Sequence, residues 1–258
     1  MTGVALALHQ YRYDQKQFWR EPASVFFTVI LPLIFLVLFV AIFGNGTVEL
    51  GPGREIRGAT YYVPSILTLA LLNATFVNLT IWLSIARERG QLKRVRATPV
   101  PAWVVIAGRT LTAAAIAAVM VAIVCAFGAL LYGVELPGTT LPALLLAVAV
   151  GVVALAGLGF AAAALVPSEN AAPPVANAIV LPLEFISGVF IPSEAIPAWM
   201  DSVASVFPVK PLFDAILTAF DPSTTGVGIA WADLAVLVAW GVAGVLLALR
   251  FFRWSPQR

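Results

Sequence analysis

The segment ARERGQLKRVRATPVP, residues 86–101, decides the fold because it divides two long runs that carry no charge. Six of its sixteen residues are charged, and five of those are basic. No Asp, Glu, Lys or Arg occurs in residues 58–86 before it or in residues 110–134 after it. A helix needs about 20 mostly apolar residues to cross a membrane. The segment is therefore a charged loop between two predicted membrane spans.

The composition of the whole chain indicates the same class. Of 258 residues, 61% are hydrophobic and 11% are charged, whereas a soluble domain carries about 25% charged residues. We therefore predict an all-α integral membrane protein. The net charge of +2 does not indicate a nucleic-acid partner. A single His and a single Cys argue against a metal site and a disulfide framework.

Apolar runs predict six transmembrane helices in one domain, residues 23–250. The expected bounds are about 24–43, 61–86, 110–133, 141–166, 172–191 and 232–250. Residues 1–22 form a separate expected element, an amphipathic helix at the membrane interface. Its apolar face is expected to hold the side chains at spacings of three and four, which are Val4, Leu8, Tyr11, Gln15 and Phe18. The alternative for this segment is a solvated tail.

Basic residues are distributed unevenly between the two sides that six spans create. Twelve lie on the side of the termini and of residues 86–101, and three lie on the other side, Arg54, Arg57 and Lys210. Lys and Arg accumulate in cytoplasmic loops. We therefore predict that both termini are cytoplasmic.

The outer segment between the fifth and sixth spans, residues 192–230, keeps apolar residues at helical spacing. Pro197, Pro208 and Pro211 interrupt any long helix there. We expect short helices that lie on the outer surface or re-enter the membrane.

The sequence carries no motif of a catalyst. It lacks the phosphate-binding pattern G-x-x-x-x-G-K-[ST], the metalloprotease pattern H-E-x-x-H and the hydrolase pattern G-x-S-x-G. We expect that the chain is not an enzyme and holds no cofactor of its own.

The pattern within residues 86–101 exceeds what a topology signal requires. Residues 87–94 contain no helix breaker except Gly90, and Leu92 and Val95 would form an apolar edge. Pro99 disfavours helix at Thr98. A short, stiff helix with an apolar edge and basic surroundings is a docking element for a partner. The alternative is a plain topology signal with no partner.

Residues 83–109, LSIARERGQLKRVRATPVPAWVVIAGR, resemble the segment between the second and third spans of ABC-2 type permeases. These are the membrane subunits of ATP-binding-cassette exporters of the daunorubicin-resistance and nodulation-export kind. Their typical pattern is A-R-E-R-E-x-G-T-L-x-R-L-x-x-T-P-L. The matching residues are Ala86, Arg87, Glu88, Arg89, Gly90, Leu92, Arg94, Thr98 and Pro99. The chain departs from the pattern by lacking residues between Arg89 and Gly90 and by carrying Gln91 where Thr is usual.

A second segment, ISGVFIPSEAIPAWMDSVASVFPVKPLFDAI, residues 186–216, resembles the family's outer segment after the fifth span. The resemblance implies an export permease of the bacterial plasma membrane, working in multidrug resistance or a related export. Two permease subunits, identical or related, would pair around the path. Separate cytoplasmic ATPase subunits would bind ATP and Mg. The cargo would be an amphiphile such as a drug, lipid, polyketide or glycan.

The family pattern further implies that residues 87–96 form the coupling helix that receives the ATPase stroke. The expected ATPase-coupling residues are Arg87, Glu88, Arg89, Gln91, Leu92, Lys93, Arg94, Arg96, Thr98 and Pro99. Candidates for the translocation path are Tyr61, Tyr62, Asn73, Phe76, Asn78 and Glu184. Core packing is the alternative for the aromatic residues. For Glu184 the alternative is an ion pair with Lys210 or with a partner subunit.

Two other functions stay open at this point. One is a stand-alone secondary transporter or channel, which would need charged or polar residues at mid-membrane in several spans. The other is a membrane anchor or assembly subunit that transports nothing. Dependence on a separate ATPase distinguishes the exporter from both.

Overall fold

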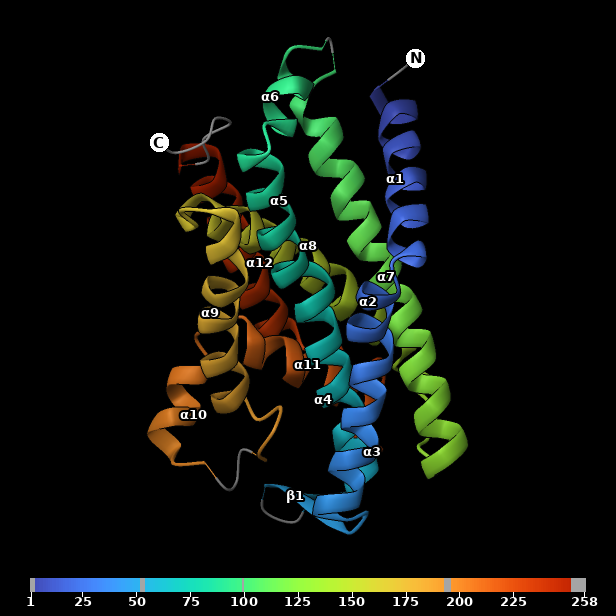
Figure 1. The fold of residues 1–258 in the computed structure, drawn as a ribbon. Helices are drawn as coiled ribbons and strands as arrows, with labels where there is room; N and C mark the ends of the chain where they lie inside the picture. The colour runs from blue at the N-terminus through green and yellow to red at the C-terminus, as the bar shows by residue number, and fades with distance from the viewer. Residues whose placement is uncertain (1–2, 52–53, 99, 193–195, 252–258) are drawn as a thin grey trace.

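The long apolar runs fold into helices, because a helix satisfies its backbone hydrogen bonds within its own segment where no water is present. The computed structural model describes residues 3–51, 54–98, 100–192 and 196–251 (Figure 1). The first long helix comprises α2 (Pro22–Val25), the π-helical turn η1 (Phe26–Ile30) and α3 (Leu31–Phe43). The second comprises α4 (Gly58–Leu72), the π-helical turn η2 (Asn73–Val77) and α5 (Asn78–Glu88). The others are α7 (Ala102–Tyr132), α8 (Leu141–Leu165) and α12 (Trp231–Phe251).

These five helices of the described chain are long and apolar enough to cross a membrane. A sixth is added if α10 (Ala198–Ala204) and α11 (Val209–Phe220), which are bent by 94°, form one broken span. The prediction of an all-α membrane protein is confirmed by these helices. Short helices were expected between the last two predicted spans, and α10 and α11 occupy that segment.

The region of the predicted fifth span holds a shorter helix than the sequence suggested. The helix α9 (Ala172–Ile186) has 15 residues, which corresponds to about 22 Å at 1.5 Å per residue. The hydrocarbon core of a bilayer is about 30 Å thick. Turns occupy residues 187–191, so the helix ends five residues before the expected boundary at 191. A single 3₁₀ turn, η3 (Glu169–Ala171), joins α9 to the segment that follows α8.

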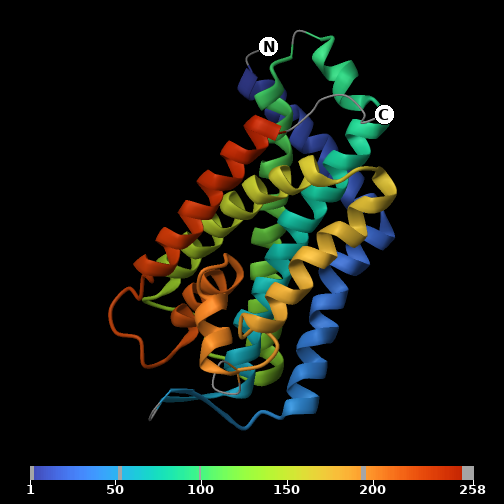
Figure 2. The ribbon, with the colours of Figure 1, turned by 90° about the vertical axis from the view of Figure 1, so that its left-hand side faces the viewer.

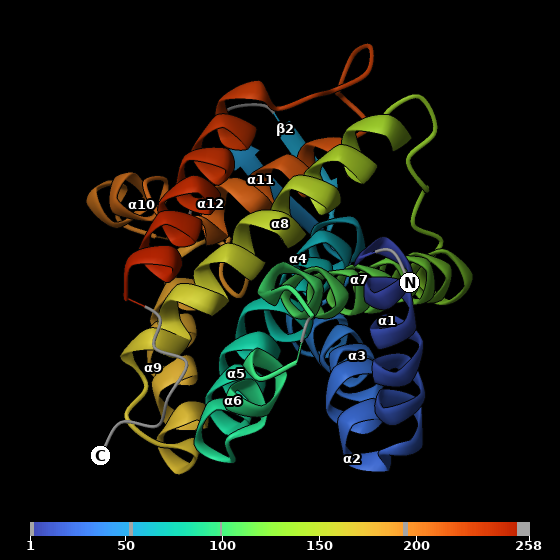
Figure 3. The same ribbon diagram turned by 90° about the horizontal axis from the view of Figure 1, so that it is seen from above.

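The helix α4 occupies the centre of the bundle. Every residue of α4 is buried, although the helix belongs to a membrane span. Figure 3 shows α4 between α3 and α7 on one side and α8 and α11 on the other. The helices α8 and α12 also pack closely against each other. A Cβ on Gly244 of α12 would lie 2.7 Å from the backbone of Gly157 in α8.

A β-hairpin that the sequence did not predict forms between α3 and α4. Its strands are β1 (Thr47–Gly51) and β2 (Arg54–Arg57), which pair antiparallel with Val48 opposite Ile56. Figure 2 shows the hairpin extending beyond the helices at one end of the bundle. We call this the hairpin end.

The opposite end carries α6 (Gln91–Arg96) and is called the α6 end. Both α1 (Gly3–Arg20), at its start, and α12, at its last turn, lie at this end (Figure 1). The hairpin and α10 lie at the other end. This arrangement agrees with the expectation that both ends of the chain share a side with residues 86–101. Which compartment that side faces stays a prediction.

Candidate functional site

The basic segment at the α6 end folds into a short helix set off from α5 by a sharp turn. Gly90 makes this turn with a φ of +68°, a left-handed conformation that favours glycine. The following helix, α6, ends at Arg96, three residues before Pro99. Pro99 itself lies outside the described residues, as does the side chain of Arg96.

The predicted coupling residues separate into exposed and buried groups. Gln91, Lys93, Arg94 and Thr98 are exposed on and just after α6. Leu92, expected on an apolar edge, is buried with only 2% of its surface exposed. It packs in a cluster with residues of α5, α7 and α8 that includes Leu83 and Phe160. The helix α6 is therefore held on the bundle by Leu92, while Lys93 and Arg94 are exposed.

Arg87 does not belong to this outward surface. Its guanidinium is buried and donates hydrogen bonds to two carbonyl oxygens at the C-terminal end of α8, those of Ala163 (2.9 Å) and Val166. The last carbonyls of a helix lack partners within the helix, and a cation near them is favoured by the helix dipole. Arg87 thus joins the end of α5 to the end of α8, and its role in ATPase coupling stays a prediction.

Glu88 and Arg89 bind the segment that follows α8. The carboxylate of Glu88 accepts a hydrogen bond from the backbone N–H of Glu169. Arg89 forms an ion pair with the carboxylate of the same residue, with 2.9 Å between Nε and Oε2. Both contacts are exposed. Three consecutive residues of the basic motif therefore contact the α8–α9 connection.

The N-terminal helix α1 is fixed along the first turns of α7. Asp14 of α1 is buried and forms an ion pair with Arg109 of α7 at 3.1 Å, and the guanidinium of Arg109 lies 3.9 Å from the ring centre of Trp82 on α5. Burial raises the pKa of Asp14, while Arg109 and a hydrogen bond from Gln10 oppose that shift. This ion pair joins residues far apart in the chain and was not predicted from the sequence.

The expected apolar face of α1 is only partly turned toward the bundle. Phe18 is buried, whereas Val4 and Leu8 are 63% and 47% exposed. The side chains that bind α7 include Asp14, which lies outside the expected face, and Gln15 of that face, which donates a hydrogen bond to the carbonyl of Thr112 (3.3 Å). An interfacial position for the exposed apolar residues stays a prediction.

The aromatic candidates for the path lie inside the chain. Tyr61 donates a hydrogen bond to the backbone carbonyl of Gly188 and its ring packs against Phe213. Tyr62 packs against aromatic rings of α3, and Phe76 is 5% exposed. All three occupy the core, in agreement with the packing alternative.

The two asparagines among the candidates are exposed instead. Asn73 and Asn78 stand at the two ends of the π-helical turn η2, in a helix that is otherwise largely buried. A π-helical turn closes between residues five apart, so the two amides fall on the same side of the helix. Asn73 donates one hydrogen bond to the carbonyl of Leu69 (3.0 Å). Exposed amides within an apolar span are costly against lipid and favour a protein or aqueous neighbour.

Glu184 is buried in α9 with 3% of its surface exposed. The suggested partner Lys210 lies on α11 and pairs with Asp201 (2.9 Å) and Asp214 (3.4 Å). The ion pairs of the described residues do not include one between Glu184 and Lys210. A role for Glu184 in the path stays a prediction.

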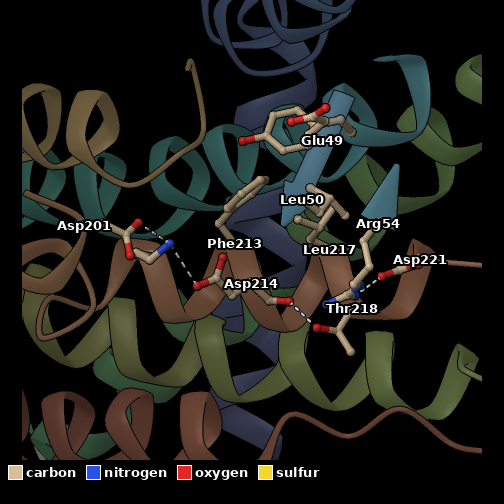
Figure 4. Close-up of a pocket in the computed structure, with 11 residues that line it drawn as sticks. Glu49, Leu50, Arg54, Asp201, Phe213, Asp214, Leu217, Thr218 and Asp221 are labelled. Atoms are coloured by element: carbon tan, nitrogen blue, oxygen red, sulfur yellow. Dashed lines mark hydrogen bonds and ion pairs between the residues drawn. The ribbon is translucent and has the colours of Figure 1, made fainter. Parts of the chain in front are cut away.

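A polar cavity of about 330 Å³ lies at the hairpin end, between the hairpin and α11 (Figure 4). Its lining consists of Glu49, Leu50, Arg54, Tyr61, Asp201, Lys210, Phe213, Asp214, Leu217, Thr218 and Asp221. The ion pair between Arg54 of β2 and Asp221 closes one side. Burial would raise the pKa of Asp221, but hydrogen bonds from Ser223 and Arg54 outweigh it and lower the pKa.

This cavity could accept a polar or charged group, with four carboxylates and two basic side chains in its wall. Within the described residues, no three His, Cys, Asp or Glu side chains are placed to hold a metal ion. The cavity was not predicted from the sequence, because it requires the hairpin to lie over α11.

Comparison with known protein families gives one match. A family model described as ABC-2 type transporter matches residues 10–220, a range that begins in α1 and ends with α11. No curated relative matches the sequence.

Proposed function

The chain belongs to the ABC-2 type transporter family, and on that premise we propose that it is the membrane-spanning permease subunit of an ATP-binding-cassette exporter. The family is one of transport permeases, so ATP hydrolysis is the task of a separate ATPase. That ATPase would hold ATP and Mg at the α6 end. The proposed direction of transport is from the α6 end to the hairpin end.

The observation that carries the proposal is the projection of α6 beyond the long helices (Figure 1). The helix has six residues, exposes Lys93 and Arg94, and is anchored through buried Leu92. An anchored helix with an outward basic surface can receive a push from a partner and pass it to the bundle. A loop that only sets the orientation of the chain in the membrane needs basic residues. It does not need a helix that is fixed to the bundle by a buried Leu92.

The proposed path lies between two permease subunits. Asn73 and Asn78 leave amide groups exposed on the second span of a single chain. A second permease facing this surface would remove the amides from lipid and place them along a shared path. The cargo would be an amphiphile, and the polar cavity at the hairpin end would lie near its exit.

The test is co-purification of the permease with a candidate ATP-binding-cassette ATPase that is co-expressed with it. We expect the double variant Lys93→Glu, Arg94→Glu to reduce ATPase recovery by roughly tenfold or more, because two reversed charges would face the partner's surface. The amount of permease in the membrane should stay unchanged. Arg87 is left intact because it is buried in the bundle.

Lys16→Glu is the matched control, since it reverses an exposed basic charge on α1 and leaves α6 intact. Its ATPase recovery should equal that of the wild type. Equal recovery with the α6 double variant would refute the proposed docking role. Transport by the purified permease with an ion gradient and no ATPase would refute the exporter function itself.

A further inference from the structure

The connection between α8 and α9 is bound at three points, by the last two residues of α5 and by Arg89, which directly follows the helix. Arg87 binds the carbonyls that end α8, Glu88 binds the backbone N–H that begins η3, and Arg89 binds the side chain of Glu169. Ser168 also caps η3 by accepting a hydrogen bond from the N–H of Ala171 (3.3 Å). Residues of the basic motif, which was expected to contact the ATPase, thus hold the α8–α9 connection in place. We call these three contacts the α5 clamp.

The α5 clamp continues directly into α6. Only Gly90 separates Arg89 from the first residue of α6, and Leu92 packs in the same apolar cluster as Phe160 and Ala163 of α8. Ala163 is also one of the residues whose carbonyl binds Arg87. A displacement of α6 must therefore act on the ends of α5 and α8 together.

The element on the far side of the clamp is α9. It begins at Ala172, three residues after Glu169, and carries the buried Glu184 two residues before its last residue, Ile186. The helix also packs along α5 and η2, the part of the second span that exposes Asn73 and Asn78. Moving α9 would alter the surroundings of the proposed path.

We propose that Arg87, Glu88 and Arg89 are positioning residues that transmit the movement of α6 to α9. The clamp joins α6, the end of α8 and η3 into one unit, so that α9 moves when the ATPase closes. The inference rests on the proposed function and assigns these residues a role inside the permease. Contact with the ATPase is left to the side chains of α6.

Arg89 and Glu169 offer the cleanest test, because their ion pair is exposed and can be reversed. The variants are Arg89→Glu, Glu169→Arg and the double reversal, each in a Cys125→Ala background so that one engineered thiol carries the probe. An environment-sensitive fluorophore is attached at Ala178→Cys, an exposed position near the middle of α9. The permease–ATPase complex in nanodiscs is compared without nucleotide and after trapping with ATP and vanadate.

We expect each single reversal to reduce the nucleotide-dependent change in emission by at least about threefold, since like charges would face each other across the contact. The double reversal should restore most of the change. ATPase recovery should be unaffected in all three variants. The same fluorophore at Leu111→Cys on α7 serves as a reference that the reversals should leave unchanged.

Other results would overturn the inference. An unchanged response of the α9 probe in the single variants would show that the ion pair transmits nothing. A wild-type complex that binds the ATPase but gives no response at α9 would show that α9 does not follow the stroke. Loss of ATPase recovery in Arg89→Glu that Glu169→Arg does not repair would place Arg89 at the ATPase surface instead. Failure of the wild-type permease to bind the ATPase would refute the proposed function, which is a separate result.

Discussion

Arg87 is the side chain whose position most changes the interpretation of the basic motif. Its charge is buried, and the two carbonyls that it binds at the end of α8 would be left without a partner in Arg87→Ala. An unsatisfied buried polar group costs about 1–3 kcal/mol. We expect this variant to lower the free energy of unfolding by about 2 kcal/mol or more, visible as a lower thermal midpoint in detergent.

Two further variants make this prediction specific. Arg87→Lys keeps the charge, but lysine lacks the planar, forked guanidinium that binds both carbonyls. This variant should therefore recover only part of the lost stability. Arg94→Ala removes an exposed charge from α6 and should leave the midpoint unchanged. A midpoint for Arg87→Ala equal to that of Arg94→Ala would contradict the buried role.

The local backbone structure around such residues is easier to predict from the sequence than the distant residues that they contact. The end of the short helix before Pro99 followed from a backbone preference that acts over a few residues. Residues 87–96 were expected to form one helix, but Gly90 adopts a left-handed turn that separates the end of α5 from α6. The partners of Arg87 and Arg89 lie about 80 residues away along the chain. Nothing in the motif itself indicates that the connection after α8 passes over the end of α5.

At the scale of elements, charge alone placed some boundaries incorrectly. The third span was expected to begin at residue 110 because Arg109 was treated as a limit, yet α7 begins at Ala102. Arg109 is tolerated inside the helix because Asp14 neutralises it and Trp82 stacks on it. The hairpin was missed for a related reason, since its strands are only five and four residues long and carry charges on both faces.

The turn between α5 and α6 yields a prediction about an element. Gly90 has a φ of +68°, and no other atom lies within 4 Å of the position that a Cβ would take. Gly90→Ala is therefore strained only by its backbone, at a cost of about 1 kcal/mol. We expect a small loss of thermal stability and a larger loss of ATPase recovery, because relief of the strain would reorient α6.

Gly138 provides a matched control for this change. Its surroundings are equally open, but its φ lies outside the left-handed region. Gly138→Ala should alter neither the thermal midpoint nor the ATPase recovery. Equal effects of the two substitutions would mean that the conformation of Gly90 does not set the direction of α6.

At the scale of the whole molecule, the all-α membrane class could be predicted from composition and from the length of the charge-free runs. The exposed polar surfaces and the cavity of the single chain could not be predicted in this way. Asn73 and Asn78 were candidates because they are polar residues in an apolar span, but their exposure depends on how α5 packs against α8 and α9. The cavity at the hairpin end needs residues from β1, β2, α10 and α11 together, and no local pattern specifies that meeting.

The orientation of the whole bundle gives the last prediction. By sequence, twelve of the fifteen basic residues fall in the segments predicted to share a side with residues 86–101. The preference for basic loops in the cytoplasm predicts that the α6 end faces inward. Single cysteines at two exposed positions in a Cys125→Ala background test it, namely Ala97→Cys just after α6 and Thr225→Cys between α11 and α12. In intact cells, a membrane-impermeant maleimide should label position 225 and leave position 97 unlabelled until the membrane is permeabilised. The reverse pattern would invert the topology and would place α6 on the outer side, where a cytoplasmic ATPase could not reach it. Labelling of both positions in intact cells would place the two ends of the bundle on one side and would contradict the spanning arrangement.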